Sequence, residues 1–410
     1  MTHTVIGWDI GGAHVKAALL RDGRLEAVNQ WPCALWQGLH LLDAVIDDAL
    51  ARWPAAHPPR VPTTGYDQAT RPPAPTGPDS EEETYPQHAV TMTGEMVDLF
   101  HSRKEGVTRL VRHLEQRLGP NLHLFCSSGA WVGSADAADR WQELASANWA
   151  ATARLVCSRL MAPMSTASDH PHRSGEQVTL DDVMLVDIGS TTTDFIPLAK
   201  GRVLAVGASD SERLRSGELL YQGAVRTPLC ALAGRIEFRG RRYNLMNEWF
   251  ATTADVYRLT GELDPAHDQH PAPDGGSKDV EGSSRRLARM IGHDAQEGSL
   301  DDWKRFAREW RRRQLSLLQS ELERVEMQHW LRQDEGLPRG APRRAGGPMA
   351  LVGAGCGSFL VRALAQATQR LHLSFDSVVA APPHLQDGTS VCAPAVAVAM
   401  LYDRDRVGRS

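Results

Sequence analysis

Two short segments with the same order of residue types constrain this chain more than any other feature of its sequence. Asp9-Ile10-Gly11-Gly12 follows an apolar run near the start, and Asp187-Ile188-Gly189-Ser190 follows another near the middle. Each offers a carboxylate at a strand end and a glycine turn through which backbone N–H groups can approach an anion closely. One such segment is typical of a tight hairpin turn. Two of them in one chain predict duplicated β-rich openings that face one ligand.

The residues around both turns suit the binding of a polyphosphate. His14 and Lys16 follow the first turn, and Lys16 adds a positive charge within reach of the same anion. Threonine hydroxyls follow the second turn and add donors without bulk. An aspartate at a strand end can hold a divalent cation, so we predict Mg²⁺ between Asp9 and Asp187. The predicted phosphate-binding residues in these turns are Gly11, Gly12, His14, Gly189, Ser190, Thr191 and Thr192.

The rest of the pattern alternates strand and helix, as in an α/β chain. We expect strands at 3–12, 13–20 and 24–31, a helix at 35–52, a strand-turn-strand at 182–198 and a basic helix at 300–331. Three stretches, 54–86, 264–284 and 336–348, carry too few apolar residues to offset the entropy of ordering and are expected to be loops without catalytic residues. We divide the chain into residues 1–180, with the Pro-rich insertion 54–86, and 181–410, with a helical insertion at about 228–335.

A third glycine-rich segment, Gly353-Ala354-Gly355-Cys356-Gly357, lies between an expected strand and an expected helix. It does not match GxGxxG and lacks the acidic partner of a dinucleotide fold. With the two aspartate-glycine segments it resembles the phosphate-1, phosphate-2 and adenosine motifs of the actin–hexokinase–heat-shock-chaperone ATPase superfamily. The resemblance implies two RNase-H-like lobes around a central cleft, with Gly353 and Gly355 beside the phosphates.

Composition argues against several other classes. The chain has 45 basic and 50 acidic side chains and a net charge of −5, so we expect no nucleic-acid partner. No apolar run approaches the roughly 20 residues that span a bilayer, and the N-terminus lacks the pattern of a secretory signal. The six cysteines show no CxxC pair and no metal-ligand spacing, which argues against a zinc site or a disulfide scaffold. We expect a cytoplasmic protein that acts on small molecules, without a membrane partner.

Five further segments narrow the family. They are residues 93–98 (TGEMVD), 146–153 (SANWAATA), 217–228 (GELLYQGAVRTP), 250–257 (FATTADVY) and 285–290 (RRLARM). This set is similar to the hydantoinase/oxoprolinase-related proteins of tetrahydromethanopterin-linked one-carbon metabolism. The resemblance implies methanofuran or methylofuran biosynthesis. In that chemistry a furanmethyl diphosphate loses diphosphate while the phenol oxygen of γ-glutamyltyramine, or of a tyrosine equivalent, attacks the methylene carbon.

This implied reaction assigns roles to named residues. Asp9, Lys16 and Asp187 are expected to be catalytic, because diphosphate leaves only when its developing charge is neutralised. The phenol must also lose its proton, and Glu95 and Glu218 are the candidates for the general base. Arg226 is a candidate to bind a substrate carboxylate or the diphosphate, and Asn148 is a further candidate for substrate binding.

Two other classes of function stay open at this point. Phosphate turns alone equally suit an ATP-dependent hydantoinase- or oxoprolinase-like hydrolase or a small-molecule kinase. They also suit a non-enzymatic, actin-like nucleotide switch. A homo-oligomer is likewise left open.

Overall fold

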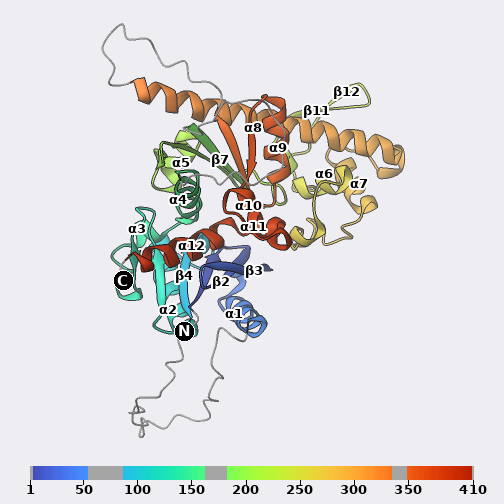
Figure 1. Cartoon of the computed structure of the whole chain (residues 1–410). Helices are drawn as coiled ribbons and strands as arrows, with labels where there is room; N and C mark the ends of the chain where they lie inside the picture. Colours follow the sequence, from blue (N-terminus) through green and yellow to red (C-terminus); the bar gives the residue numbers. More distant parts are fainter. Residues whose placement is uncertain (1–2, 54–85, 162–181, 335–348, 409–410) are drawn as a thin grey trace, which may run out of the picture.

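The computed structural model describes residues 3–53, 86–161, 182–334 and 349–408. Two mixed β-sheets form its centre, one below the other in Figure 1. The first sheet has the order β3-β2-β1-β4-β5-β6. Its strands are β1 (Thr4–Ile10), β2 (His14–Arg21), β3 (Arg24–Pro32), β4 (Gln87–Met92), β5 (Leu122–Phe125) and β6 (Trp131–Val132).

The second sheet repeats the pattern of the first. Its order is β10-β8-β7-β13-β14, and β9 also pairs with β8. In both sheets three consecutive strands pair antiparallel. A later strand then pairs in parallel with the first of these three, and a further strand pairs in parallel with that one. The strands are β7 (Asp182–Ile188), β8 (Thr193–Ala199), β9 (Arg202–Val203), β10 (Leu219–Leu220), β13 (Ala350–Ala354) and β14 (His372–Ser374). The predicted duplication is therefore confirmed.

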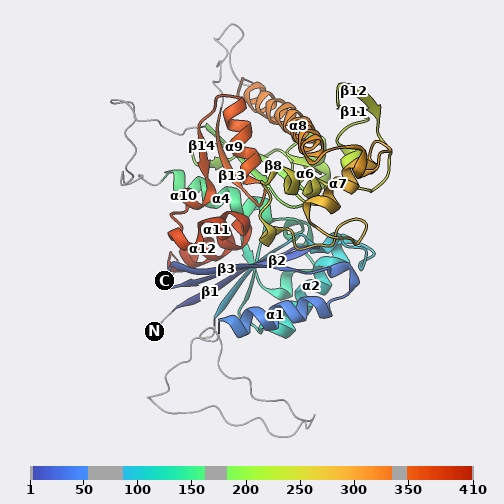
Figure 2. The same cartoon turned by 90° about the vertical axis from the view of Figure 1, so that its right-hand side faces the viewer.

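Helices cover both sheets, and a separate hairpin of β11 (Arg235–Phe238) and β12 (Arg241–Asn244) projects from the second half (Figures 1 and 2). The helices of the described ranges are α1 (His40–Arg52), α2 (Arg103–Leu118), α3 (Trp141–Leu144), α4 (Asn148–Met161), α5 (Asp210–Ser216), α6 (Thr253–Thr260), α7 (Val280–Arg289), α8 (Leu300–Asp334), α9 (Ser358–Ala367), α10 (Phe375–Val378), α11 (Gln386–Val391) and α12 (Ala393–Val407).

The hairpin between β2 and β3 closes on a two-residue turn. Asp22 and Gly23 both have positive φ, 48° and 74°, as the two central residues of a type I′ turn require. The expected strand pair at 13–20 and 24–31 is confirmed. On its other side β2 pairs antiparallel with β1, which makes Asp9 and Lys16 direct cross-strand partners.

Strand β1 is buried on both faces, which explains its continuous apolar run. Ile6 and Trp8 belong to one core cluster with residues of α1 and α2, whereas Val5 belongs to another with residues of α12. A Cβ on Gly7 would lie only 2.1 Å from the carbonyl oxygen of Ala395. The small residues of α12 therefore let the last helix of the chain lie directly on the first sheet (Figure 2).

A break in the expected helix at 35–52 exposes a tryptophan. The segment divides into a 3-10 turn, Leu35–Gln37, and helix α1. Gly38 lies between them with φ of 143°, a conformation that ends the turn. As a result Trp36 is 37% exposed, whereas its neighbour Leu35 is fully buried.

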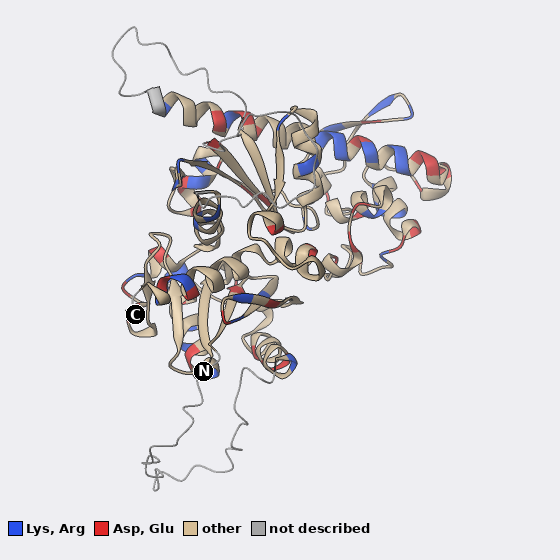
Figure 3. Ribbon diagram, viewed as in Figure 1, with Lys and Arg blue, Asp and Glu red and all other residues tan. Residues whose placement is uncertain are grey.

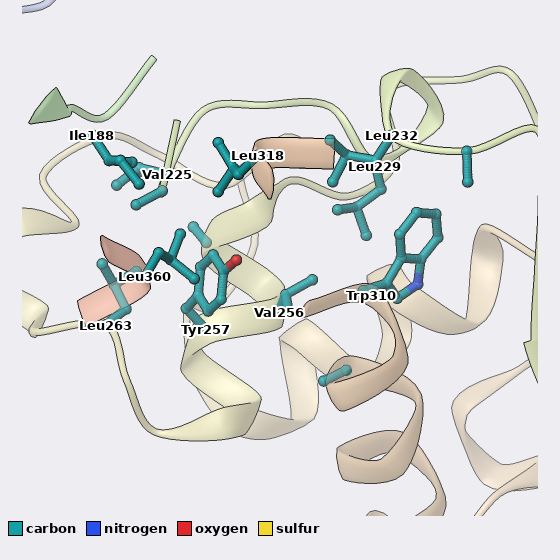
Figure 4. Packing of buried hydrophobic residues seen from close by; sticks show 14 of the residues in the cluster. Ile188, Val225, Leu229, Leu232, Val256, Tyr257, Leu263, Trp310, Leu318 and Leu360 are labelled. Atoms are coloured by element: carbon teal, nitrogen blue, oxygen red, sulfur yellow. The ribbon is translucent and has the colours of Figure 1, made fainter. Parts of the chain in front are cut away.

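The predicted helical insertion shares one hydrophobic core with the second sheet. Tyr257 of α6 and Trp310 of α8 are fully buried among aliphatic side chains of several elements (Figure 4). The Tyr257 hydroxyl donates a hydrogen bond to Gln314 on α8, so its polar atom is satisfied inside the cluster. The basic helix expected at 300–331 is confirmed as α8. This packing holds the insertion against the second sheet.

The expectation of a loop at 264–284 holds for most of the segment and is wrong at its end, 280–284, where α7 begins. The segment contains a 3-10 turn, Pro265–His267, and the start of α7. Ion pairs order it in place of apolar residues: Arg258 binds Asp268 at 2.7 Å, and Arg286 binds Asp274 at 3.0 Å. The prediction failed because it counted apolar residues only.

The basic run on α8 is balanced by nearby acidic side chains. Figure 3 shows Lys and Arg gathered along α8 and the β11–β12 hairpin. Arg311 pairs with Glu262 and Arg312 with Glu309. The run is therefore a set of local ion pairs on a solvated helix face.

Several predictions fall on other parts of the chain. The insertions at 54–86 and 336–348 lie outside the described residues, Pro86 excepted, and so does the boundary at 180/181. The division into two domains stays a prediction. Among the described helices, none combines the length and the apolar character needed to cross a membrane.

Candidate active site

The first glycine turn presents Asp9 and Lys16 side by side. The two residues face each other across β1 and β2, and Lys16 Nζ lies 3.9 Å from Asp9 Oδ2. The backbone N–H of Gly11 donates to the carbonyl of His14 at 2.9 Å and closes the turn. Asp9 is only 5% exposed, and its Oδ1 has no hydrogen-bond partner. A buried carboxylate oxygen without a partner is costly and points to a missing ligand at this position.

The second turn has the same geometry with an opposite charge. Asp187 faces Asp194 across β7 and β8, at the place that Asp9 and Lys16 hold in the first sheet. Gly189 N–H donates to the Thr192 carbonyl at 2.9 Å. Arg213 binds Asp194 at 2.9 Å and so neutralises the second carboxylate. In the first turn the positive charge comes from the paired strand itself, through Lys16, whereas in the second turn it comes from Arg213 of α5.

Both turns line one cavity of about 570 Å³. This volume lies in the usual range for small-molecule sites. The residues predicted from the sequence that line it are Asp9, Gly11, Gly12, His14, Lys16, Asn148, Asp187, Gly189, Ser190, Thr191, Thr192 and Arg226. The tertiary structure thus brings together two segments that are far apart in the chain.

Burial and charge act against each other in this cavity. Burial lowers the pKa of Lys16, but the negative charges of Asp9 and Asp187 outweigh burial, so the pKa of Lys16 is raised overall. Burial raises the pKa of Asp9, while Lys16 lowers it. Burial raises the pKa of the Asp187 carboxyl to about 7; Lys16 opposes this shift, and Asp194 and Asp9 add to it. A ligand that supplies positive charge would relieve the repulsion among these carboxylates.

The raised pKa of Asp187 predicts a pH-dependent stability difference. The ordinary value is 3.8, so between pH 3.8 and about 7 the folded protein holds a proton that the unfolded chain has lost. Raising the pH through this window therefore destabilises the ligand-free fold. Asp187→Asn lacks this titration, and we expect its melting temperature to rise relative to wild type between pH 5 and pH 8. A constant difference between the two proteins at both pH values would contradict the assignment.

The structure does not bring Glu95 into the cavity. Glu95 is 1% exposed; its Oε1 accepts hydrogen bonds from Ser146 Oγ at 2.8 Å and from Arg103 at 3.3 Å. Burial raises its pKa, and the hydrogen bond from Ser146 and the charge of Arg103 oppose that shift. Ser146 itself lines the cavity. The link between Glu95 and the cavity is therefore the Ser146 hydroxyl.

Glu218 also lies outside the cavity of Asp9, where other contacts hold it. One oxygen accepts from the backbone N–H of Val206 at 2.6 Å, and the other from Gly207 at 2.9 Å and Ser216 Oγ at 3.0 Å. It is 2% exposed and does not line the cavity of Asp9. These contacts make Glu218 the anchor of the loop before α5.

The third glycine segment packs behind the second turn. Gly355 has φ of 82°, and a Cβ there would lie 2.5 Å from Asp187 Oδ1. A Cβ on Gly353 would meet His372 and Val361. Neither glycine lines the cavity. Gly355 therefore permits close approach of the turn after β13 to Asp187, and Gly353 permits close approach of α9 and β14 to β13.

The sequence analysis missed an aromatic and histidine wall of the cavity. Trp36 and Tyr221 line it and are 37% and 62% exposed. His270, from the segment expected to be a loop, packs edge-on against His14 with ring centres 4.5 Å apart. The histidines in the segment DPAHDQHP were the one available signal in the sequence, and they do not reveal that His270 packs against His14.

The repeated strand order and the two aspartate-glycine turns around one cleft define the class. This is the two-lobed RNase-H-like fold of the actin–hexokinase–heat-shock-chaperone ATPase superfamily, as the sequence predicted. The hydantoinase/oxoprolinase family model matches residues 87–404, so the chain belongs to that family.

Two curated relatives are similar to this chain. Both are named (4-{4-[2-(gamma-L-glutamylamino)ethyl]phenoxymethyl}furan-2-yl)methanamine synthase. The one from Methanocaldococcus jannaschii is 31% identical over 58% of this chain and 66% of its own length, just under two thirds. The one from Methanococcus vannielii is 33% identical over 36% of this chain and 67% of its own. A solved structure, the Acidaminococcus fermentans (R)-2-hydroxyglutaryl-CoA dehydratase component A, covers 99% of both chains at 11% identity with a TM-score of 0.41.

Proposed function

We propose that this chain forms an aryl ether in methanofuran or methylofuran biosynthesis. It transfers the aminomethyl-furanylmethyl group, through its methylene carbon, from a furanmethyl diphosphate to the phenol oxygen of γ-glutamyltyramine or a tyrosine equivalent, and it releases diphosphate. The observation that carries the proposal is the single cavity shared by Lys16, Asp9, Asp187 and both glycine turns. The name of the two relatives contains the same phenoxymethyl-furan ether.

The transfer requires one bond to break and one to form at the methylene carbon. The carbon–oxygen bond to diphosphate breaks, and its electron pair leaves with the diphosphate. The phenol oxygen forms the new bond and releases its proton to a base. Negative charge grows on the leaving group, so the Lys16 ammonium acts most strongly in the transition state. The N–H groups of Gly11 and Gly189 close the two turns and so hold the backbone in place around it.

The two aspartates suit a divalent cation. The buried Oδ1 of Asp9 has no partner, and burial disfavours the charge on Asp187. Among the described residues, no three His, Cys, Asp or Glu side chains are grouped as a metal site. Mg²⁺ commonly uses one or two carboxylates, water and substrate phosphates instead. Held by Asp9 and Asp187, it would neutralise charge on the diphosphate.

Of the two candidate bases, the geometry favours Glu95. Its raised pKa suits proton uptake, and Ser146 links it to the cavity by a hydrogen bond. The phenol proton would pass to Ser146 Oγ as the Ser146 proton passes to Glu95. Glu218 has no such link because backbone N–H groups occupy both its oxygens.

The proposed reaction is tested by product analysis without nucleotide. Incubation with the furanmethyl diphosphate, γ-glutamyltyramine and Mg²⁺ is expected to give the aryl ether and one diphosphate for each ether. Mass spectrometry measures the ether, and a pyrophosphatase-coupled assay measures the diphosphate. The matched control replaces the furan substrate with ATP and measures phosphate release. Ether formation only with ATP hydrolysis, or ATP hydrolysis without the furan, would favour the ATP-dependent relatives instead.

A further inference from the structure

Three side chains form a corner of the cavity that the proposed function has not used. Trp36 comes from the 3-10 turn after β3, whereas Tyr221 and Arg226 follow β10 of the second sheet. All three line the cavity, and the Arg226 guanidinium carbon lies 5.5 Å from the centre of the Trp36 ring. We call Trp36, Tyr221 and Arg226 the aromatic corner. It joins the two halves of the chain across the cleft.

Within the described ranges, no carboxylate compensates the charge of Arg226. Burial lowers the pKa of its half-buried guanidinium, and the one neighbour that opposes this shift is the phenol of Tyr221. No acidic side chain in the described ranges forms an ion pair with Arg226. Lys16, by contrast, interacts with Asp9 and Asp187. A guanidinium that is partly desolvated and unpaired is suited to bind an anionic group of a ligand bidentately.

The rings of the aromatic corner are unusually accessible. Tyr221 is 62% exposed and Trp36 is 37% exposed, although burial of aromatic rings stabilises a fold strongly. Accessible ring faces inside a cleft are suited to stack on a flat ligand. The corner therefore offers both a surface for a ring and a cation for an anion.

The segment 264–284 supports this corner from behind. The ring centre of His270 lies 6.3 Å from that of Trp36 and 4.5 Å from that of His14. The amide of Gln269 also donates to the Gln30 carbonyl on β3 at 3.3 Å. His270 is thus a positioning residue that holds the helical insertion against the first glycine turn and Trp36.

We propose that the aromatic corner binds the acceptor substrate, an aryl compound whose side chain ends in a carboxylate. The phenol ring stacks on Trp36 and Tyr221, and the α-carboxylate of the γ-glutamyl group pairs with Arg226. This inference rests on the proposed function, since the γ-glutamyl group comes from the product named for the relatives. The diphosphate lies on the other side, where Lys16 already offers its charge.

Two ligands that differ only in the γ-glutamyl group test the inference. Isothermal titration without the furan substrate measures the Kd of γ-glutamyltyramine and of tyramine. Arg226→Gln is expected to raise the Kd of γ-glutamyltyramine by about tenfold or more and to change the Kd of tyramine by less than about twofold. Arg308→Gln, an exposed arginine on α8 outside this cavity, is the matched control and should change neither.

Other results would overturn the inference. Equal weakening of both ligands would mean that Arg226 shapes the site without binding the carboxylate. If Arg226→Gln raises the Kd of inorganic diphosphate and leaves that of γ-glutamyltyramine unchanged, Arg226 binds the leaving group instead. If wild type makes the ether and Arg226→Gln keeps the wild-type KM for γ-glutamyltyramine, the corner is wrong while the proposed function stands. If wild type binds neither aryl ligand and makes no ether, the proposed function fails as well.

The positioning role of His270 has its own readout. His270→Ala is expected to raise the KM for both γ-glutamyltyramine and tyramine about equally, because it loosens Trp36, and to leave the KM for the furan substrate unchanged. His270→Phe keeps a ring against His14 and Trp36 and should restore the aryl KM. No recovery in the Phe variant would show that ring packing is not what His270 supplies.

Discussion

Asp9→Asn and Asp187→Asn are each expected to lower turnover by about 10²–10³-fold while the chain stays folded. Each removes a carboxylate from the cavity that Lys16 and both glycine turns share. In the proposed mechanism these charges hold the cation that neutralises the leaving diphosphate. Their loss is therefore felt most in the transition state. Steady-state kinetics at saturating Mg²⁺ and circular dichroism measure the two halves of this expectation.

A matched substitution separates the site from the strand. Asp182 begins strand β7, at the end opposite Asp187, and does not line the cavity. Asp182→Asn removes the same charge from the same strand and should keep turnover within about twofold of wild type. Near-normal turnover in Asp9→Asn or Asp187→Asn would contradict the assignment of these two carboxylates.

The largest effect on stability is expected at Asp255, on α6. Its side chain is fully buried, as is that of Arg286, which donates to it at 2.8 Å; Arg258 donates at 2.7 Å. The other oxygen accepts the backbone N–H of Thr252 at the start of the helix. Asp255→Ala leaves the Arg286 guanidinium buried without its closest carboxylate, and should lower the free energy of unfolding by about 3–5 kcal/mol.

A nearby surface pair provides the comparison for Asp255. Glu281 of α7 is 78% exposed and pairs with Arg285 at 3.3 Å. Glu281→Ala should cost less than about 1 kcal/mol, because exposed ion pairs contribute little. Urea unfolding measures all three proteins. A loss below about 1 kcal/mol in Asp255→Ala would show that the arginines find other partners or water.

The Asp255 network also connects stability to the site. It holds α6 to α7, and α7 ends the segment that carries His270. This segment was expected to be a loop, because ion pairs between residues such as Arg286 and Asp274 leave no apolar pattern in the sequence. Hydrophobic periodicity detects elements held by apolar burial. It does not detect elements held by charge.

The candidate general bases show a second limit of sequence reasoning. Glu218 stands beside a family-like segment, and nothing local reveals that the N–H groups of Val206 and Gly207 occupy its carboxylate. Those two residues lie in the loop before α5, and the positions of α5 and β10 set the course of that loop. The course of the loop therefore decides whether the carboxylate faces the cavity or accepts hydrogen bonds from the backbone. The sequence alone therefore left Glu95 and Glu218 equivalent.

The sequence by itself determined the two glycine turns, because each is closed by contacts only a few residues apart, such as Gly11 with His14 and Gly189 with Thr192. The same local rule predicted the alternating strands, and the resemblance of the three glycine-rich segments to known motifs indicated the superfamily. Only the tertiary structure decided what meets across the cleft: Lys16 with Asp187, and His270 with His14. These contacts join segments far apart in the chain, and packing of whole sheets and helices sets them. No short-range pattern encodes that packing.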